Sequence, residues 1–401
     1  MAGSALAQPG FRLFFIGNIF TLNGIWMQRM TLGWVAWHVS GSPSLVGLVS
    51  FIGFIPTLCL SVLFGAMTDR VDLIRACRIL QILFLISSLA LLATWSNGLL
   101  TSFAICAIAF MVGTISAAFN PMRMATAPLL ADLRHLSSVM ALSSVNLNMA
   151  RVTGPALGGL AISTLGIGGA LALQVALFLP NFVVLALLNP RCREGMDGPR
   201  QSIFSSIMEG VTLARENALI RQALLLSAVF GMLARAVMEI LPVVAGAGFD
   251  RGAEGLAVLA SCAGAGALIG GFQRVMFSHR QTHGLPPVAL ICSYLGMAAV
   301  IAVGSSTIWA LTAVAVFVLG LCSSVTAVSI VTAINLSVDD RIRGRIGGIW
   351  LTTGIGSAAL GALGLGIVAE WFGLAAAMET SGVIGVILTS LVLLGRTRSG
   401  A

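Results

Sequence analysis

Residues 148–159 read NMARVTGPALGG, and this polar, glycine-rich stretch lies inside a long apolar run. On a helix, positions spaced by four, three and four form one stripe, and here they are Ser144, Asn148, Arg151 and Pro155. Small residues beside this stripe leave a smooth surface: Gly154, Gly158 and Gly159. Such a surface lets a neighbouring helix approach closely, and the proline frees a carbonyl and bends the helix. The stretch therefore predicts a kinked helix that packs tightly in an apolar surrounding.

The composition extends this interpretation to the whole chain. Of 401 residues, 58% are hydrophobic and only 9% are charged, against about a quarter in soluble domains. Apolar segments of about 20 residues, enough to cross the hydrocarbon of a bilayer, recur from end to end. We predict twelve spans: 11–37, 44–66, 77–95, 99–120, 138–165, 168–189, 222–245, 253–277, 285–304, 307–333, 346–369 and 373–395.

These spans must be helices, because hydrocarbon offers no partner for a free backbone N–H or C=O and the pattern lacks the short alternating strands of a barrel. The predicted fold class is therefore an all-α membrane protein. The first residues, MAGSALAQPG, have no basic region before a short apolar core, so we expect the first span to be retained rather than removed as a signal peptide.

The basic residues alternate between the two sides of the membrane. All 22 are Arg, and 18 of them, Arg123 included, fall at the termini or in alternate breaks, whereas the opposite breaks hold only Arg251. The positive-inside rule then places both termini in the cytoplasm. The net charge of +8 has this topological origin, and its spread over separate patches speaks against nucleic acid as a partner.

The longest cytoplasmic break divides the spans six and six. We predict an N-terminal six-helix bundle over residues 1–189, a cytoplasmic linker with an amphipathic helix over 190–221, and a C-terminal six-helix bundle over 222–401. Two pseudo-symmetric bundles that rock about a central site are the plan of many secondary transporters.

Charged groups inside spans are costly and rarely face lipid. The predicted substrate or proton pathway consists of such groups and nearby amides: Asn23, Arg29, Asn148, Arg151, Arg235 and Glu239. Arg235 and Glu239 are four residues apart, hence on one face of an α-helix, where they can pair directly. A structural salt bridge and a substrate or proton role remain equal alternatives for these two.

Two motifs resemble the major facilitator superfamily. GAMTDRVDLIRACR, at 65–78, is similar to its cytoplasmic loop signature at Gly65, Asp69 and Arg70, and the aspartate can cap the next helix or pair with an Arg. The match departs at Asp72, where a glycine is usual. GPALGG resembles the antiporter motif of exporters at Gly154, Pro155, Gly158 and Gly159.

Longer stretches resemble one branch of that superfamily. PMRMATAPLLADL, MALSSVNLNMARVTGPALGG, EGVTLARENALIRQALLL and DDRIRGRIGG together are similar to the drug:proton antiporter branch of macrolide, enterobactin and lysophospholipid transporters, also described as transmembrane secretion effectors. The fourth-span Arg motif of classical proton-coupled exporters is missing, since no Arg lies between Leu99 and Asn120. The proton route of those exporters therefore does not carry over.

The stretch DDRIRGRIGG precedes the eleventh span. Its gating residues are predicted to be Asp340, Arg341, Arg343, Gly344 and Arg345. They can form a charge network that breaks when the inner side opens, or simply anchor the topology.

The predicted function is secondary export of a small organic molecule, such as a drug, siderophore or metabolite, by alternating access and proton antiport. Uptake, lipid flipping, and a transport-inactive receptor or scaffold remain as alternatives. Without a nucleotide loop, a nucleophile–base pair or metal-ligand spacing among seven Cys and four His, we expect no enzyme activity, cofactor or metal. The expected partners are the small-molecule substrate, protons and the lipid bilayer, and the expected protein is a monomer in a bacterial-type inner membrane.

Overall fold

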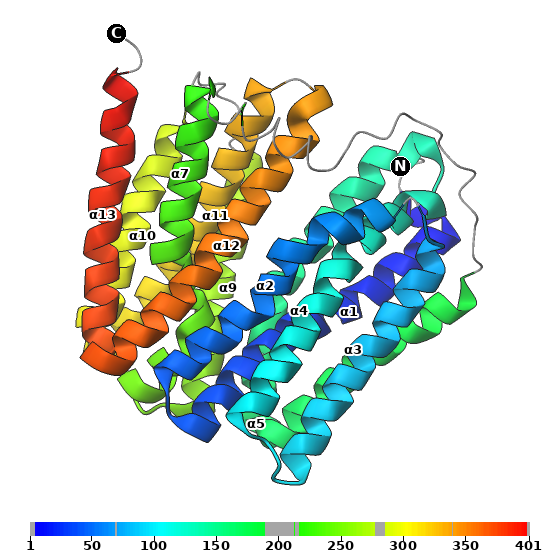
Figure 1. Ribbon diagram of the computed structural model, residues 1–401, viewed down its shortest axis with the longest axis horizontal. Helices are drawn as coiled ribbons and strands as arrows, with labels where there is room; N and C mark the ends of the chain where they lie inside the picture. The colour runs from blue at the N-terminus through cyan, green and yellow to red at the C-terminus, as the bar shows by residue number, and fades with distance from the viewer. Residues whose placement is uncertain are drawn as a thin grey trace. The chain divides into compact units, whose positions relative to one another are not determined.

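The computed structural model describes residues 5–68, 70–188, 212, 216–276, 285–338 and 340–398. For residues 62, 133, 274–276, 340–345 and 395–398 it describes the backbone alone. Within these ranges the chain is helical and has no strand, as the sequence predicts (Figure 1). Most of the predicted linker, 190–221, lies outside the described residues.

Contacts divide the chain into two compact units. The first contains residues 1–40 and 52–199, and the second contains 41–51 and 200–401. The helices of the first unit are α1 (Pro9–Ser40), the larger part of α2 (Pro43–Met67), α3 (Leu73–Ser96), α4 (Ser102–Thr126) and α5 (Leu136–Leu187). Short 3₁₀ turns lie at Ala5–Ala7, Ala127–Leu130 and Leu133–His135.

The second unit begins with an interrupted helix. α7 (Ala218–Leu233) is followed by a 3₁₀ segment η4 (Arg235–Ile240), a single turn α8 (Leu241–Val243) and a π-helical turn η5 (Val244–Gly248). The remaining helices are α9 (Gly252–Met276), α10 (Pro287–Ser305), α11 (Trp309–Ser337), α12 (Asp340–Phe372) and α13 (Leu374–Arg398). The first turns of α2, up to Phe51, pack within this unit.

Ten helices of the described residues are long and apolar enough to span a membrane. One of them, α5, has 52 residues and contains the fifth and sixth predicted spans, which join at Gly166 with a positive φ of 70°. α1 falls outside the ten because its amides and Arg29 lower its hydropathy, although its length of 32 residues suffices. These two cases account for the difference from the twelve predicted spans.

α1 and α5 pack closely at the glycines of the opening stretch. A Cβ added at Gly154 would lie 2.6 Å from the Trp26 Cβ and 3.0 Å from the Asn23 carbonyl oxygen. At Gly158 the nearest atom would be the Met27 Cγ at 3.4 Å, an ordinary contact. Of these two motif glycines, therefore, Gly154 is the one whose missing side chain sets the approach of the two helices.

Buried amides cross-link three helices of the first unit. The Gln81 side chain on α3 accepts from Thr21 Oγ1 (3.1 Å) and Asn181 Nδ2 (3.2 Å), and it donates to the Phe178 carbonyl (2.7 Å). A second set joins Thr31 to Gln174, whose Nε2 donates to Ser88. Since no water competes in this interior, such interhelical hydrogen bonds fix the register of α1, α3 and α5.

Arginines at one end of the first unit do more than mark topology. Arg78 on α3 donates to the carbonyls of Leu185 and Leu188, which end α5, and thus satisfies a helix C-terminus that would otherwise lack partners. Arg123 on α4 is only 3% exposed. The prediction that Arg123 lies in a break between spans is wrong, because α4 continues to Thr126 and buries this side chain.

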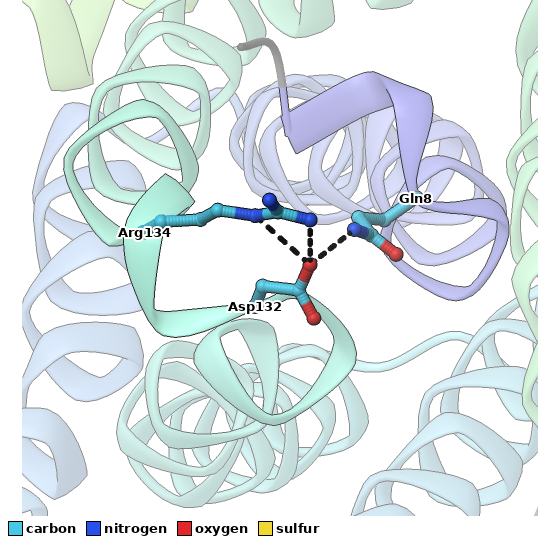
Figure 2. Close-up of polar contacts among 3 residues, drawn as sticks. All are labelled: Gln8, Asp132 and Arg134. Atoms are coloured by element: carbon cyan, nitrogen blue, oxygen red, sulfur yellow. Dashed lines mark hydrogen bonds and ion pairs between the residues drawn. The ribbon is translucent and has the colours of Figure 1, made fainter.

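The N-terminal segment is attached at the same end. The Asp132 carboxylate accepts from Gln8 Nε2 at 2.8 Å and pairs with Arg134 Nη2 at 2.9 Å, and both contacts can be followed in Figure 2. Ala5 is fully buried in the apolar cluster that includes Leu73 and Leu188. The first turn of the described chain is thereby held against the connection between α4 and α5.

We predict that Gly154→Ala lowers the melting temperature of the purified protein, because its methyl group meets Trp26 and backbone atoms that cannot give way. Overpacking of this kind costs about 1–3 kcal/mol. Thermal unfolding in detergent measures the effect. Gly158→Ala is the matched control and should be neutral or slightly stabilising, since alanine also favours the helix by up to about 1 kcal/mol. Equal losses in both variants would contradict the assigned packing.

Candidate functional site

Two arginines of the first unit converge on one indole ring. The Arg29 guanidinium carbon on α1 lies 5.2 Å from the Trp26 ring centroid and 4.0 Å from that of Phe54 on α2. The Arg151 guanidinium carbon on α5 lies 5.6 Å from the same Trp26 centroid. All three distances are within the range of cation–π attraction. Two of the three predicted pathway arginines thus contact the same ring, and both are half-buried.

Asn23 supports this cluster from α1. Its Nδ2 donates to the Ile19 carbonyl (2.8 Å), and its Oδ1 lies 2.6 Å from the Thr153 hydroxyl on α5. That hydroxyl also lies 2.9 Å from the Met149 carbonyl, so its single proton is shared between two acceptors. Asn23 therefore links the two helices beside Gly154 and positions them rather than pointing to solvent.

Asn148 lies one turn from Arg151 on the predicted polar stripe. Its Oδ1 accepts from Arg151 Nη1 at 3.4 Å, and its Nδ2 donates to the Ser144 carbonyl at 3.0 Å. Asn148 is exposed and Arg151 half-buried, so the stripe runs along an accessible side of α5. Pro155 lies within α5, and Gly159 is buried.

Arg235 and Glu239 do not share a face. Both belong to the 3₁₀ segment η4, where three residues complete a turn, so side chains four apart diverge by about 120°. The structure has no ion pair between them, unlike the direct pair that α-helical geometry predicts. Within the second unit, the Ser50 hydroxyl lies 3.5 Å from the Glu239 carbonyl oxygen. Three residues further on, Pro242 has no N–H to offer that carbonyl.

The loop motif is only partly described. Gly65 accepts the Thr68 hydroxyl on its carbonyl at 2.7 Å, and Arg70 is exposed. Asp69 lies outside the described residues. The cap of α3 is Asp72, whose Oδ1 accepts from the Arg75 N–H at 2.9 Å. The residue that departs from the superfamily signature thus makes the capping contact, which was one of the two roles predicted for Asp69.

The predicted inner network begins α12. Its backbone is helical from Asp340 on, but the side chains of the predicted gating residues there are outside the described set: Asp340, Arg341, Arg343, Gly344 and Arg345. Their role remains a prediction.

The structure adds residues that sequence reasoning did not select. Phe54 is 4% exposed and contacts Arg29, and Thr153 bridges to Asn23. No local signal identifies them, since Phe and Thr are common in spans. The amides Gln81, Gln174 and Asn181 did carry a signal, being strongly polar groups in apolar segments. Among the described residues no group of His, Cys, Asp or Glu is arranged to hold a metal.

The described residues form apolar helices of spanning length, with Arg29 and Arg151 half-buried among those of the first unit. A model of the transmembrane secretion effector family matches residues 2–399. The chain belongs to this family of major facilitator transporters.

Two curated relatives have named cargo. The enterobactin exporter EntS of Shigella boydii serotype 18 is 24% identical over 400 residues, covering 95% of this chain and 91% of that protein. The staphyloferrin A transporter of Staphylococcus aureus is 28% identical over 153 residues, which is 38% of each chain.

Solved structures agree on the fold. A point mutant of the nucleoside transporter NupG superposes with a TM-score of 0.77 at 12% identity, covering 96% of this chain and 99% of that one. A bacterial homologue of the human lysosomal transporter Spinster gives 0.75 at 14% identity, covering 96% and 97%.

A double-mutant cycle tests the geometry of η4. We expect Arg235→Gln and Glu239→Gln to change the free energy of unfolding additively, with a coupling below about 0.5 kcal/mol, because the two groups do not touch. Thermal unfolding of both single variants and the double variant gives the coupling. Asn23→Ala with Thr153→Ala is the positive control, since those side chains are in contact. A coupling of about 1 kcal/mol or more between Arg235 and Glu239 would contradict the described geometry.

Proposed function

We propose that the chain is a secondary exporter that moves a small organic molecule out of the cytoplasm by alternating access, in exchange for protons. The observation that carries the proposal is the pair of half-buried guanidinium groups on Trp26, beside the accessible polar stripe of α5. A charged group inside a spanning bundle is expensive, so it faces the bundle interior or a water-filled path, or it pairs with other polar groups. Such a path is what a transporter requires.

Export is favoured over uptake by the relatives. EntS is an enterobactin exporter by name and matches nearly the whole chain, and the fifth-span GPALGG resembles the motif of exporters. A siderophore or similar metabolite is accordingly the proposed cargo class. The proposed setting is a bacterial inner membrane, with both termini in the cytoplasm as the arginine distribution predicts and with a monomer as the working unit.

Glu239 is the proposed proton carrier. It is a half-buried carboxyl group in the interrupted stretch after α7, where a 3₁₀ segment and a π-helical turn replace regular α-helix. Such irregular turns often mark functional positions in helices. The sequence contains no nucleotide-binding loop, so an ion gradient is the proposed energy source for transport.

Flux in oriented vesicles tests the exporter. In inside-out proteoliposomes with an acidic lumen, we expect enterobactin or staphyloferrin A to accumulate inside, because outward proton movement drives cargo into the lumen. A protonophore should abolish the accumulation, and empty liposomes serve as the control. If the cargo equilibrates across the membrane without a proton gradient, the protein is a facilitator. If the cargo moves only out of the lumen, the protein is an uptake transporter. If neither compound crosses the membrane, the receptor or scaffold alternative is favoured.

Replacing the proposed proton carrier should uncouple the transporter. We expect Glu239→Gln to reduce pH-driven accumulation at least about tenfold, while exchange of labelled for unlabelled cargo continues, because the amide cannot release a proton. Glu254→Gln, at an exposed carboxyl group in the first turn of α9, is the matched control. Normal pH-driven accumulation in Glu239→Gln would refute the assignment.

A further inference from the structure

Two buried cysteines of the second unit face each other across neighbouring helices. Cys292 lies on α10 and is 6% exposed, and Cys322 lies on α11 and is fully buried. Both are present as thiols, and the Cys322 thiol is hydrogen-bonded to the side chain of Cys292. The two positions are far apart in the sequence, so the contact comes from the packing of the two helices.

The topology accounts for this contact. Only residues 306–308 join the end of α10 to the start of α11, and a connection this short makes consecutive helices antiparallel neighbours. Cys292 lies thirteen residues before Ser305, where α10 ends, and Cys322 lies thirteen residues after Trp309, where α11 begins. Because both helices rise by the same amount per residue, the two cysteines lie at the same level along the pair. The register of the helices therefore brings the thiols together.

The two backbones are also close enough for a covalent link. Gly296 lies one turn from Cys292 on the same face of α10, and a Cβ added there would lie 3.5 Å from the Cys322 Cβ. Disulfides join Cβ atoms that are about 3.5–4.5 Å apart. At this level α10 thus approaches α11 to the spacing that a disulfide requires.

The chemistry of the site favours a sulfur–sulfur bond over a metal centre. Among the described residues no group of three or more His, Cys, Asp or Glu is arranged to hold a metal ion, so a tetrahedral centre would lack its remaining ligands. Two thiolates would also place negative charge in the interior of a spanning bundle, which is costly. A disulfide is neutral and needs no third group.

We propose that Cys292 and Cys322 form a redox modification site, in which a small neutral two-electron oxidant converts the two thiols into a disulfide that joins α10 to α11. This inference concerns the second unit by itself and does not depend on the proposed transport function. The link closes the segment between the two residues into a loop, which stabilises the folded state chiefly by restricting the unfolded chain. A thiol reductant restores the original pair.

Diamide, an uncharged diazene, is an oxidant of this class. The sulfur of Cys292, the more exposed of the two, adds to the N=N double bond and forms a sulfur–nitrogen bond. The Cys322 sulfur then attacks the Cys292 sulfur, so that the sulfur–sulfur bond forms as the sulfur–nitrogen bond breaks. The two thiol protons end on the two nitrogens. The thiols together lose two electrons, and the diazene is reduced to a hydrazine.

Mass spectrometry of the purified full-length protein tests the proposal. After diamide treatment, the remaining thiols are alkylated in denaturant and the chain is digested. We expect a linked pair of peptides that contain Cys292 and Cys322, and we expect dithiothreitol to remove the link. Before oxidation, a charged maleimide applied to the folded protein should leave both residues unmodified, because burial shields their thiols.

Cysteine variants connect the link to this pair. One variant retains only Cys292 and Cys322 and has alanine at the other cysteines: Cys59, Cys77, Cys106, Cys192 and Cys262. Diamide should consume both of its thiols within one chain. The matched control retains Cys262 and Cys322 instead, because α9 also packs against α11 although the thiol that contacts Cys322 is that of Cys292. We expect the control pair to link at least about tenfold more slowly, since proximity supplies the rate.

The results support or overturn the proposal as follows. Melting temperatures show which variants fold, and the original protein supplies the test where a variant does not. A linked Cys292–Cys322 peptide pair from the original protein, with slower linking in the control, supports the modification site. Links formed only between chains, equal rates for the two cysteine pairs, or unchanged thiols at both residues after diamide treatment would each overturn it.

Discussion

The close approach of α5 to α1 at Gly154 is the constraint on which the rest of the first unit depends. It brings Arg151 beside Trp26 and aligns Thr153 with Asn23, so that the packing contact also sets the position of these polar side chains. In hydrocarbon there is no hydrophobic force between helices, and tight packing with a few hydrogen bonds must hold them together. The buried amides around Gln81 supply those bonds on the other side of α1.

The two units differ in the regularity of their helices and in how these helices carry polar groups. The first keeps regular helices and uses polar side chains as interhelical connectors, and its charge is wholly basic within the helices. The second breaks its first helix into α, 3₁₀ and π segments around Arg235 and Glu239. The carboxyl group of Glu239 therefore lies in an interrupted segment and not in a regular α-helix.

The family places the chain among transporters but does not name its cargo. Relatives such as EntS share about a quarter of their residues with it, and the superposed structures include a nucleoside transporter, so the common fold serves several substrates. Specificity must therefore come from particular side chains. In the first unit, Arg29 and Arg151 beside Trp26 are polar side chains of this kind.

The sequence alone determined the helical membrane fold, because twelve apolar segments of spanning length leave the backbone no alternative in lipid. It also selected Arg29 and Arg151, since charge in an apolar run stands out. Only the tertiary structure decided what those residues do. Whether Arg123 is buried, whether Asp72 caps α3 and whether Arg235 meets Glu239 depend on where helices end and how they wind. Likewise, the contact between Arg29 and Phe54 joins positions on separate helices, which no local pattern encodes.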